Sequence, residues 1–179
     1  MNWCQLMIKK NGYTMKRIYK YVWLLVLPFL CTTGLMAQSK VEEARKLIQD
    51  GKAECILIKN DTIYGQERGH GVSPLLVMYD EHREAMSDAV LVDKVIGRAA
   101  AAIAICGKVK HVHGELMSED AIEFLNKNGI TTSYTILVHR ILNRKRDGLC
   151  PLEQSVEGVE DAASALVALR KRIETLQKQ

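Results

Sequence analysis

The hydrophobic residues of this chain recur with two different spacings, and the alternation between them predicts the order of its helices and strands. Apolar residues three or four positions apart are typical of amphipathic helices, and strict alternation is typical of half-buried strands. The predicted helices cover residues 41–51, 74–82, 93–106, 118–128 and 160–176, with a short helix before Gly158, and the predicted strands cover residues 53–59, 62–66, 89–92, 110–116 and 131–138. Residues 139–146 either extend the last strand or form a helix.

The predicted helix over residues 93–106, DKVIGRAAAAIAIC, is the most apolar segment after residue 40. Its charged residues are Asp93, Lys94 and Arg98, and the rest of its circumference is apolar, which is typical of a buried helix. Its five alanines and Gly97 let neighbouring elements approach closely. We therefore expect a central helix packed against a sheet, with Asp93 and Lys94 at its N-terminus.

The element order begins with a β-hairpin and continues with alternating strands and helices. A hairpin supplies antiparallel strands, whereas strands joined by helices run parallel. The order therefore predicts a three-layer α/β/α domain with a mixed sheet. The last helix, residues 160–176, is expected to cover the sheet.

The charges are distributed unevenly, because the first 37 residues hold five basic residues and no acidic ones. The rest of the chain has 20 basic and 21 acidic residues and is nearly neutral. Proteins that bind nucleic acids generally present a strongly basic surface. No nucleic-acid partner is expected.

From Met15 onward, the N-terminal segment has the pattern of a secretory signal peptide. Three basic residues precede an apolar run over residues 22–31, and small residues lead to a cleavage position after Ala37. The run is too short to span a hydrocarbon core of about 30 Å, so no stable membrane span is expected after cleavage. The leader resembles those of exported bacterial proteins. We expect an extension and signal peptide over residues 1–37, a domain over residues 38–179 and a periplasmic or secreted product; a cytoplasmic location is the alternative, and the true start, Met1 or Met15, stays open.

Four further segments carry a resemblance to a known family. They are ERGHGVSPLL at 67–76, LVDKVIGRAAA at 91–101, HGELMSEDAIEFLNKNGI at 113–130 and GLCPLEQSV at 148–156. Together they resemble the DUF1893 (TM1506-type) family of prokaryotic domains of unknown function. The resemblance implies a cytidine-deaminase-like fold, which agrees with the predicted element order, and it implies no particular activity.

That fold permits a test for metal chemistry. Zinc deaminases carry a His-x-Glu or Cys-x-Glu motif at the start of the central helix and Pro-Cys-x-x-Cys at the start of the next, and these residues hold and assist the zinc ion. Here the predicted helices start with Asp93-Lys94 and Ser118-Glu119, and the chain contains no Cys-x-x-Cys pair. We expect no zinc-hydroxide mechanism and no cofactor.

Two helix N-termini should converge where such a metal would lie, and helix N-termini favour anionic groups. The candidate ligand-binding residues near this point are Asp93, Lys94, Ser118, Cys150 and Glu153. The alternative is that these residues are helix caps, surface charges and a turn. A loop over residues 68–71 is expected to approach them.

Two functions remain open from the sequence. The first is a small-ligand-binding or interaction module without catalytic activity, and the alternative is a metal-independent enzyme acting on a nucleotide-like or nucleobase-like molecule. His111 and His113 share one face of a predicted strand, where they are either metal ligands or ordinary strand-edge histidines. The oligomeric state and the disulfide state of Cys55, Cys106 and Cys150 are left open by the sequence.

Overall fold

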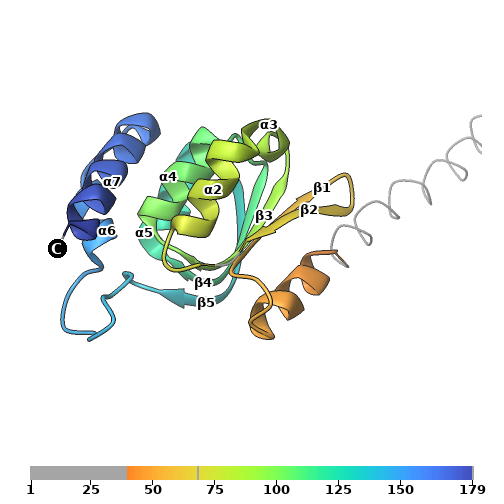
Figure 1. Ribbon diagram of the computed structural model, residues 1–179, viewed down its shortest axis with the longest axis horizontal. Coiled ribbons are helices and arrows are strands. Elements are labelled where there is room, and N and C mark those ends of the chain that lie inside the picture. Colours follow the sequence, from red (N-terminus) through yellow and green to blue (C-terminus); the bar gives the residue numbers. More distant parts are fainter. Residues whose placement is uncertain (1–39, 68, 179) are drawn as a thin grey trace, which may run out of the picture. The chain divides into compact units, whose positions relative to one another are not determined.

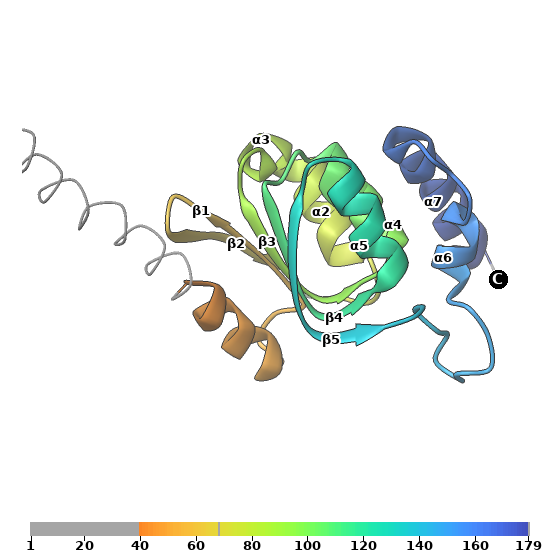
Figure 2. The same cartoon turned by 180° about the vertical axis from the view of Figure 1, so that it is seen from behind.

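The computed structural model describes residues 40–178 with the exception of residue 68, and these residues form one mixed sheet with helices on both faces (Figures 1 and 2). The strands are β1 (Cys55–Lys59), β2 (Thr62–Glu67), β3 (Val90–Ile96), β4 (His111–Ser118) and β5 (Thr131–Val138), and the helices are α2 (Ser73–Glu81), α3 (Arg83–Met86), α4 (Arg98–Cys106), α5 (Glu119–Lys127), α6 (Pro151–Val156) and α7 (Ala162–Gln177), preceded by a helix over residues 40–49.

The strand order in the sheet is β2-β1-β3-β4-β5. β1 pairs antiparallel with both β2 and β3, whereas β3, β4 and β5 run parallel. The hairpin turns at Asn60 and Asp61, which both adopt positive φ angles of 50° and 56°. Asn and Asp tolerate this conformation in two-residue hairpin turns. The sheet is therefore mixed, with an antiparallel hairpin at one edge and three parallel strands at the other.

Two separate apolar clusters cover the two faces of the sheet. On one face, Ala44 and Ile48 of the first helix pack on Ile56, Ile58 and Val92. On the opposite face lie α2, α4 and α5 (Figure 1), and the cluster there is the larger of the two and includes Leu75, Ile103 and Phe124. The predicted three-layer α/β/α arrangement with a mixed sheet is confirmed.

The central helix begins later than the sequence predicts. Asp93 and Lys94 belong to β3, which extends to Ile96, and α4 begins at Arg98 after Gly97. The apolar run holds several β-branched residues before Gly97 and a block of alanines after it, and these residue types favour strand and helix respectively. The prediction that Asp93 and Lys94 form the N-terminus of the central helix is therefore wrong.

The C-terminal helix α7 packs against α4 and not on the sheet. Its apolar face, which includes Ala165, Leu166 and Leu169, joins the same buried cluster as the alanines of α4. In both views α7 lies on the side of α4 and α5 that faces away from the strands (Figures 1 and 2). The expectation that residues 160–176 cover the sheet is wrong, because the α2, α4 and α5 layer lies between them.

Residues 139–149 neither extend the last strand nor form a helix. They form a loop whose two sides meet at a single bridge between Leu142 and Leu149. The predicted signal peptide lies outside the described residues. Among the described residues, no helix is long and apolar enough to cross a membrane.

Candidate functional site

The N-terminus of α4 is capped by a side chain from a distant part of the chain. Glu153 on α6 accepts hydrogen bonds from the backbone N–H groups of Arg98, at 2.8 Å, and Ala99, at 3.0 Å. These groups have no partner within the helix itself, and a carboxylate is favoured at the positive end of the helix dipole. The α4 N-terminus is thus occupied by the protein's own carboxylate.

Glycine at position 97 makes this contact possible. A Cβ atom at Gly97 would lie 2.4 Å from Oε1 of Glu153 and 2.6 Å from its carboxyl carbon. Burial raises the pKa of Glu153 above its ordinary value, although the hydrogen bonds from Ala99 and Arg98 act in the opposite direction. Gly97 and Glu153 therefore form a matched pair, in which the glycine leaves room for a partly buried carboxylate.

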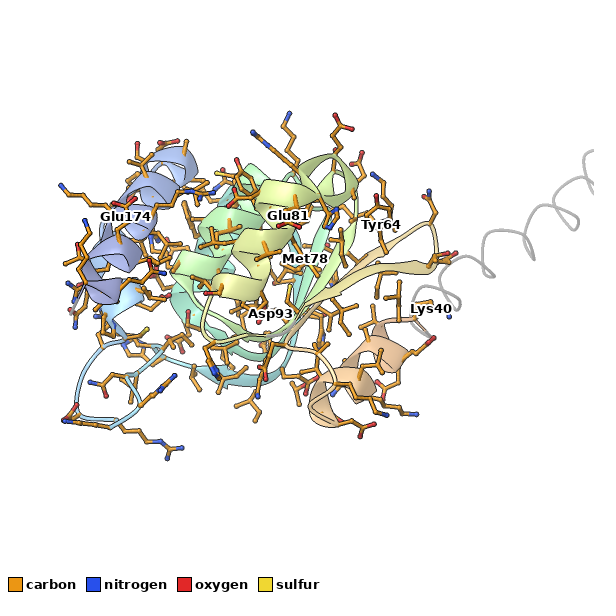
Figure 3. All side chains as sticks on the ribbon, in the orientation of Figure 1. Lys40, Tyr64, Met78, Glu81, Asp93 and Glu174 are labelled. Atoms are coloured by element: carbon orange, nitrogen blue, oxygen red, sulfur yellow. The ribbon has the colours of Figure 1, made fainter. Side chains whose placement is uncertain are left out.

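Asp93 is a second buried carboxyl group beside this pair. It is 8% exposed, and its Oδ1 accepts a hydrogen bond of 2.9 Å from the backbone N–H of Val95. Burial raises its pKa from 3.8 to about 7, in spite of hydrogen bonds from Val95 and from the thiol of Cys55. In Figure 3, Asp93 lies within the body of the domain, whereas Lys40 and Glu174 lie at its periphery. Asp93 is thus a carboxyl group that exchanges its proton near neutral pH.

Asp93 lines a cavity of about 120 Å³, here called the Asp93 cavity. Its walls come from the end of β3, the start of α4, the start of α6 and the loop before α2. The lining residues are Glu54, Gly71, Val72, Asp93, Lys94, Val95, Gly97, Ala100, Ile141, Cys150, Leu152 and Glu153. The ammonium group of Lys94 lies 3.1 Å from Oε1 of Glu54, so the charged groups there include one ion pair and two further acids.

A larger cavity of about 380 Å³, here called the acidic cavity, adjoins the first. Its lining residues are Arg98, Ser118, Glu119, Asp120, Glu123, His139, Arg140, Ile141, Leu149, Glu153, Glu157, Gly158 and Glu160. Six of them are acidic, so this cavity repels anions although two helix N-termini meet there. The two cavities share Glu153 and Ile141 in their walls.

Arg98 joins the two helix N-termini. Its Nη1 donates to Asp120 at 2.8 Å, its Nη2 donates to the carbonyl of Val159 at 2.6 Å, and its guanidinium carbon lies 4.1 Å from the centre of the Phe124 ring. Ser118 caps α5 by accepting a hydrogen bond of 3.2 Å from the N–H of Ala121. The predicted convergence of the two helix starts therefore holds, and acidic side chains fill the space between them.

Four of the five residues predicted to form the site meet in the Asp93 cavity: Asp93, Lys94, Cys150 and Glu153. Ser118, the fifth, lies in the acidic cavity and acts as a helix cap. Glu54, which lies just before β1 without any motif, was not predicted to line the site. Gly97 was expected to allow close packing, and the group that approaches it is the carboxylate of Glu153. The predicted loop does approach at Gly71, and residue 68 lies outside the described residues.

The residues at the two helix starts do not fit a zinc deaminase centre. The first turn of α4 carries Arg98 and alanines, and the first turn of α5 carries Glu119 and Asp120. The His-x-Glu spacing does occur at residues 82–84 and 113–115, but the first lies between α2 and α3 and the second on β4. Within the described part of the chain, no group of three or more His, Cys, Asp or Glu residues is placed to hold a metal ion.

Comparison with known proteins places this geometry in a family. The profile described as "TM1506: Domain of unknown function (DUF1893)" matches residues 43–173. A crystal structure of a DUF1893 family protein from Thermotoga maritima has 20% identity and a TM-score of 0.66, over 74% of this chain and 90% of that one. Acinetobacter baumannii RibD is similar over smaller parts, with 15% identity and a TM-score of 0.43 over 55% of this chain and 36% of that one. No curated protein matches the sequence. The chain belongs to the DUF1893 family.

Proposed function

We propose that this domain binds a small, uncharged or cationic molecule of nucleobase size in the Asp93 cavity. The observation that carries the proposal is a buried carboxyl group with a pKa of about 7 in the wall of a cavity. Buried ionisable groups with strongly displaced pKa values are concentrated at functional sites. A structural role alone would be served equally well by an apolar residue at this position, without the cost of burying a carboxyl group.

The size of the Asp93 cavity supports a ligand smaller than a nucleotide. Pockets for drug-sized ligands generally have volumes of about 300–1,000 Å³, whereas this cavity has about 120 Å³. Its apolar wall residues, which include Val72, Ala100 and Leu152, suit the faces of a flat ring. A nucleobase or another small heterocycle matches these dimensions better than a nucleoside phosphate does.

The charges of the cavity support the same choice. Glu54, Asp93 and Glu153 contribute carboxyl groups and Lys94 contributes the one ammonium group, which is already paired with Glu54. A phosphate would enter this acidic environment against electrostatic repulsion. A carboxyl group that is protonated about half of the time near pH 7 both donates and accepts hydrogen bonds. It therefore complements the adjacent amino group and ring nitrogen of a nucleobase.

A panel of free bases and the matching nucleotides tests this proposal. We expect one or more bases at 100 times the dissociation constant to stabilise the protein by about 2.7 kcal/mol, which corresponds to a rise in melting temperature of about 5–10 °C. Nucleotides should give no such rise. Asp93→Asn and Lys94→Ala should weaken the effect, while Glu123→Gln, in the acidic cavity, should preserve it. The proposal would be contradicted if a base and its nucleotide stabilised the protein equally, or if no base stabilised it.

The same carboxyl group supports a second candidate function, metal-independent acid-base catalysis on such a molecule. A group with a pKa near the working pH is best suited to transfer protons, and Asp93 has this property. Incubation of the protein with each bound base, followed by mass spectrometry of the small molecules, separates the two functions. Recovery of every base unchanged argues for a binding module.

We also propose that the domain works after export to the periplasm or outside the cell, in accordance with the leader over residues 15–37. The mass of the protein isolated from the native cell tests this. An N-terminus at Gln38 is the expected result, and an intact leader on cytosolic protein would overturn the proposal.

A further inference from the structure

A line of polar side chains crosses β4 and β5 outside both cavities. Thr131 Oγ1 lies 2.7 Å from Nδ1 of His111, Nε2 of His111 lies 2.9 Å from Oγ of Ser133, and that oxygen lies 2.8 Å from Nδ1 of His113. The other ring nitrogen of His113 lies 3.5 Å from Oε1 of Glu115. The parallel register sets His111 beside Thr131 and His113 beside Ser133, and residues two apart on a strand share a face.

The position of each hydrogen follows from the charge of Glu115. Burial would raise the pKa of Glu115, but hydrogen bonds from Arg45, at 2.6 Å, and Gln49 lower it below its ordinary value, so this group is ionised at neutral pH. A carboxylate only accepts hydrogen bonds. We therefore assign the hydrogen of neutral His113 to Nε2, on the side of Glu115, although the 3.5 Å separation is not a hydrogen bond. Nδ1 is then the acceptor for the hydroxyl hydrogen of Ser133.

The rest of the line is consistent with this direction. His111 then donates from Nε2 to the oxygen of Ser133, and its Nδ1 takes the one hydroxyl hydrogen of Thr131. In this arrangement Thr131 does not donate to the carbonyl of Lys110, which lies 3.2 Å from the same hydroxyl oxygen. Burial lowers the pKa of both histidines, so both are neutral at pH 7. His113 is 6% exposed, and among the described residues its Nε2 has no hydrogen-bond partner within normal range. A neutral imidazole thus lies between a hydroxyl group and a carboxylate.

We propose that Ser133 is a nucleophile for small carboxylic esters and related electrophiles, with His113 as its base and Glu115 as the group that orients and stabilises the imidazole. A hydroxyl, an imidazole and a carboxylate in this order perform the same roles in serine hydrolases. Here the two ring nitrogens are exchanged, since Nδ1 faces the serine and Nε2 faces the acid. This site shares no residue with the Asp93 cavity, so the proposal does not depend on ligand binding in that cavity.

The overall reaction is the hydrolysis of an ester by water to an alcohol and a carboxylic acid. Oγ of Ser133 bonds to the ester carbonyl carbon while its proton passes to Nδ1 of His113, and the imidazolium is stabilised by Glu115. The bond between the carbonyl carbon and the alcohol oxygen then breaks, and His113 returns the proton to the departing alcohol. Water releases the acid from Ser133 by the same steps. Ser133 is half-buried on the edge strand β5, and the proposal requires that a small ester reach its oxygen from the exposed part of this side chain.

A fluorophosphonate tests the proposal on the full protein, because this reagent phosphonylates activated serines with loss of fluoride. We expect one adduct, located at Ser133 by peptide mass spectrometry, with the same adduct in Ser164→Ala and none in Ser133→Ala. His113→Gln should slow labelling by about 100-fold or more, the usual contribution of a general base. In the unmodified protein, labelling should also slow at acid pH as His113 becomes protonated.

Labelling of Ser133 in the unmodified protein is sufficient to test whether this serine is activated. This matters because replacing the buried His113 can unfold the domain. No adduct at Ser133 after prolonged exposure, or an adduct confined to other serines, would overturn the proposal. Labelling of a folded His113→Gln variant at an unchanged rate would equally overturn it.

Discussion

Helices α4 and α7 both receive a carboxylate at the N-terminus, and they receive it in opposite ways. At α7, the exposed Asp161 accepts hydrogen bonds from the N–H groups of Ala163, at 3.4 Å, and Ser164, at 2.7 Å. Hydrogen bonds from Ser164 hold its pKa below its ordinary value. At α4, the carboxylate of Glu153 comes from 54 or 55 residues away, and burial raises its pKa.

The difference separates a cap that only ends a helix from a cap that also lines two cavities. A local, solvated carboxylate accepts hydrogen bonds from helix amides with little loss of hydration, and Asp is one of the residues preferred at this N-cap position. The remote, partly buried carboxylate of Glu153 satisfies the same kind of amides but has lost part of its hydration, which is costly for a charged group. Glu153 lines both cavities beside Asp93. The cavity at the α4 end is thus lined by one buried acid, Asp93, and one partly buried acid, Glu153.

The pH dependence of stability should show the largest effect, through Asp93. Its pKa is about 7 in the folded protein against 3.8 for an ordinary aspartate. Between about pH 4 and pH 7 the unfolded chain has released this proton while the folded protein retains it, so the free energy of unfolding should fall over this range, by about 4 kcal/mol in total. Urea unfolding at a series of pH values measures this. In Asp93→Asn the free energy of unfolding should not fall in this way. Parallel pH profiles for Asp93→Asn and the unmodified protein would contradict the raised pKa of Asp93.

Glu153→Ala should destabilise the protein by about 3 kcal/mol, because it leaves the buried amides of Arg98 and Ala99 without acceptors. Glu153→Gln, which retains one acceptor oxygen, should cost less. The control is Glu157→Ala on the same segment, whose exposed pairing with Arg140 is worth at most about 1 kcal/mol. Urea unfolding compares the three variants, and equal losses for Glu153→Ala and Glu157→Ala would remove the special role of Glu153.

Gly97→Ala should cost about 2 kcal/mol in the unmodified protein, since the added Cβ displaces the carboxylate of Glu153. The same change should cost almost nothing once Glu153 is alanine, because nothing remains to be displaced. Gly148→Ala is the control, as its Cβ would meet its nearest neighbour at an ordinary 3.5 Å. An identical cost of Gly97→Ala in both backgrounds would show that the two residues are not coupled.

Ser118→Ala should cost about 1 kcal/mol, the usual value for the loss of a local N-cap. Ser118 caps α5 without the help of Glu153, so the effects of the two substitutions should add within error. The double variant with Glu153→Ala measures this by urea unfolding. Strong coupling between the two positions would mean that the two helix starts act as one unit.

The smallest expected effect is that Asp161 and Glu153 change the free energy of unfolding in opposite directions as the pH rises. The pKa of Asp161 is lowered, so its contribution to stability is present above the ordinary pKa of 3.8 and is lost as the pH falls through the lower folded value. The pKa of Glu153 is raised, so stability falls as the pH rises from about 4.5 through the higher folded value. The isosteric variants Asp161→Asn and Glu153→Gln, compared with the unmodified protein across this range, should show opposite slopes.

The sequence predicted most of the elements because their signals are local. The hairpin turn at Asn60-Asp61, the helix cap at Ser118 and the helix end near Gly129 each depend on residues a few positions apart. Alternation likewise identified β4 and β5 within one or two residues at each end. Such features form in nearly the same way whatever the rest of the chain does.

The boundary between β3 and α4 was misplaced for a physical reason. A short apolar run without clear periodicity fits a buried strand as well as a buried helix, and residues 90–106 form such a run. The parallel pairing of β3 with β4 settles the conformation of Asp93 and Lys94, because it satisfies the backbone groups of β3 from another strand. Gly97 was the one local sign of the break.

By itself, the sequence determined the order of the elements, the mixed α/β architecture and a group of polar residues of which four line one cavity. Only the tertiary structure decided that Glu153 caps α4, that Gly97 makes room for it and that Asp93 is buried on a strand with a pKa of about 7. Turns and caps arise from neighbouring residues, whereas burial and remote hydrogen bonds arise from elements brought together by folding. The displaced pKa values belong to this second group, because desolvation exists only after the chain has closed around the carboxyl groups.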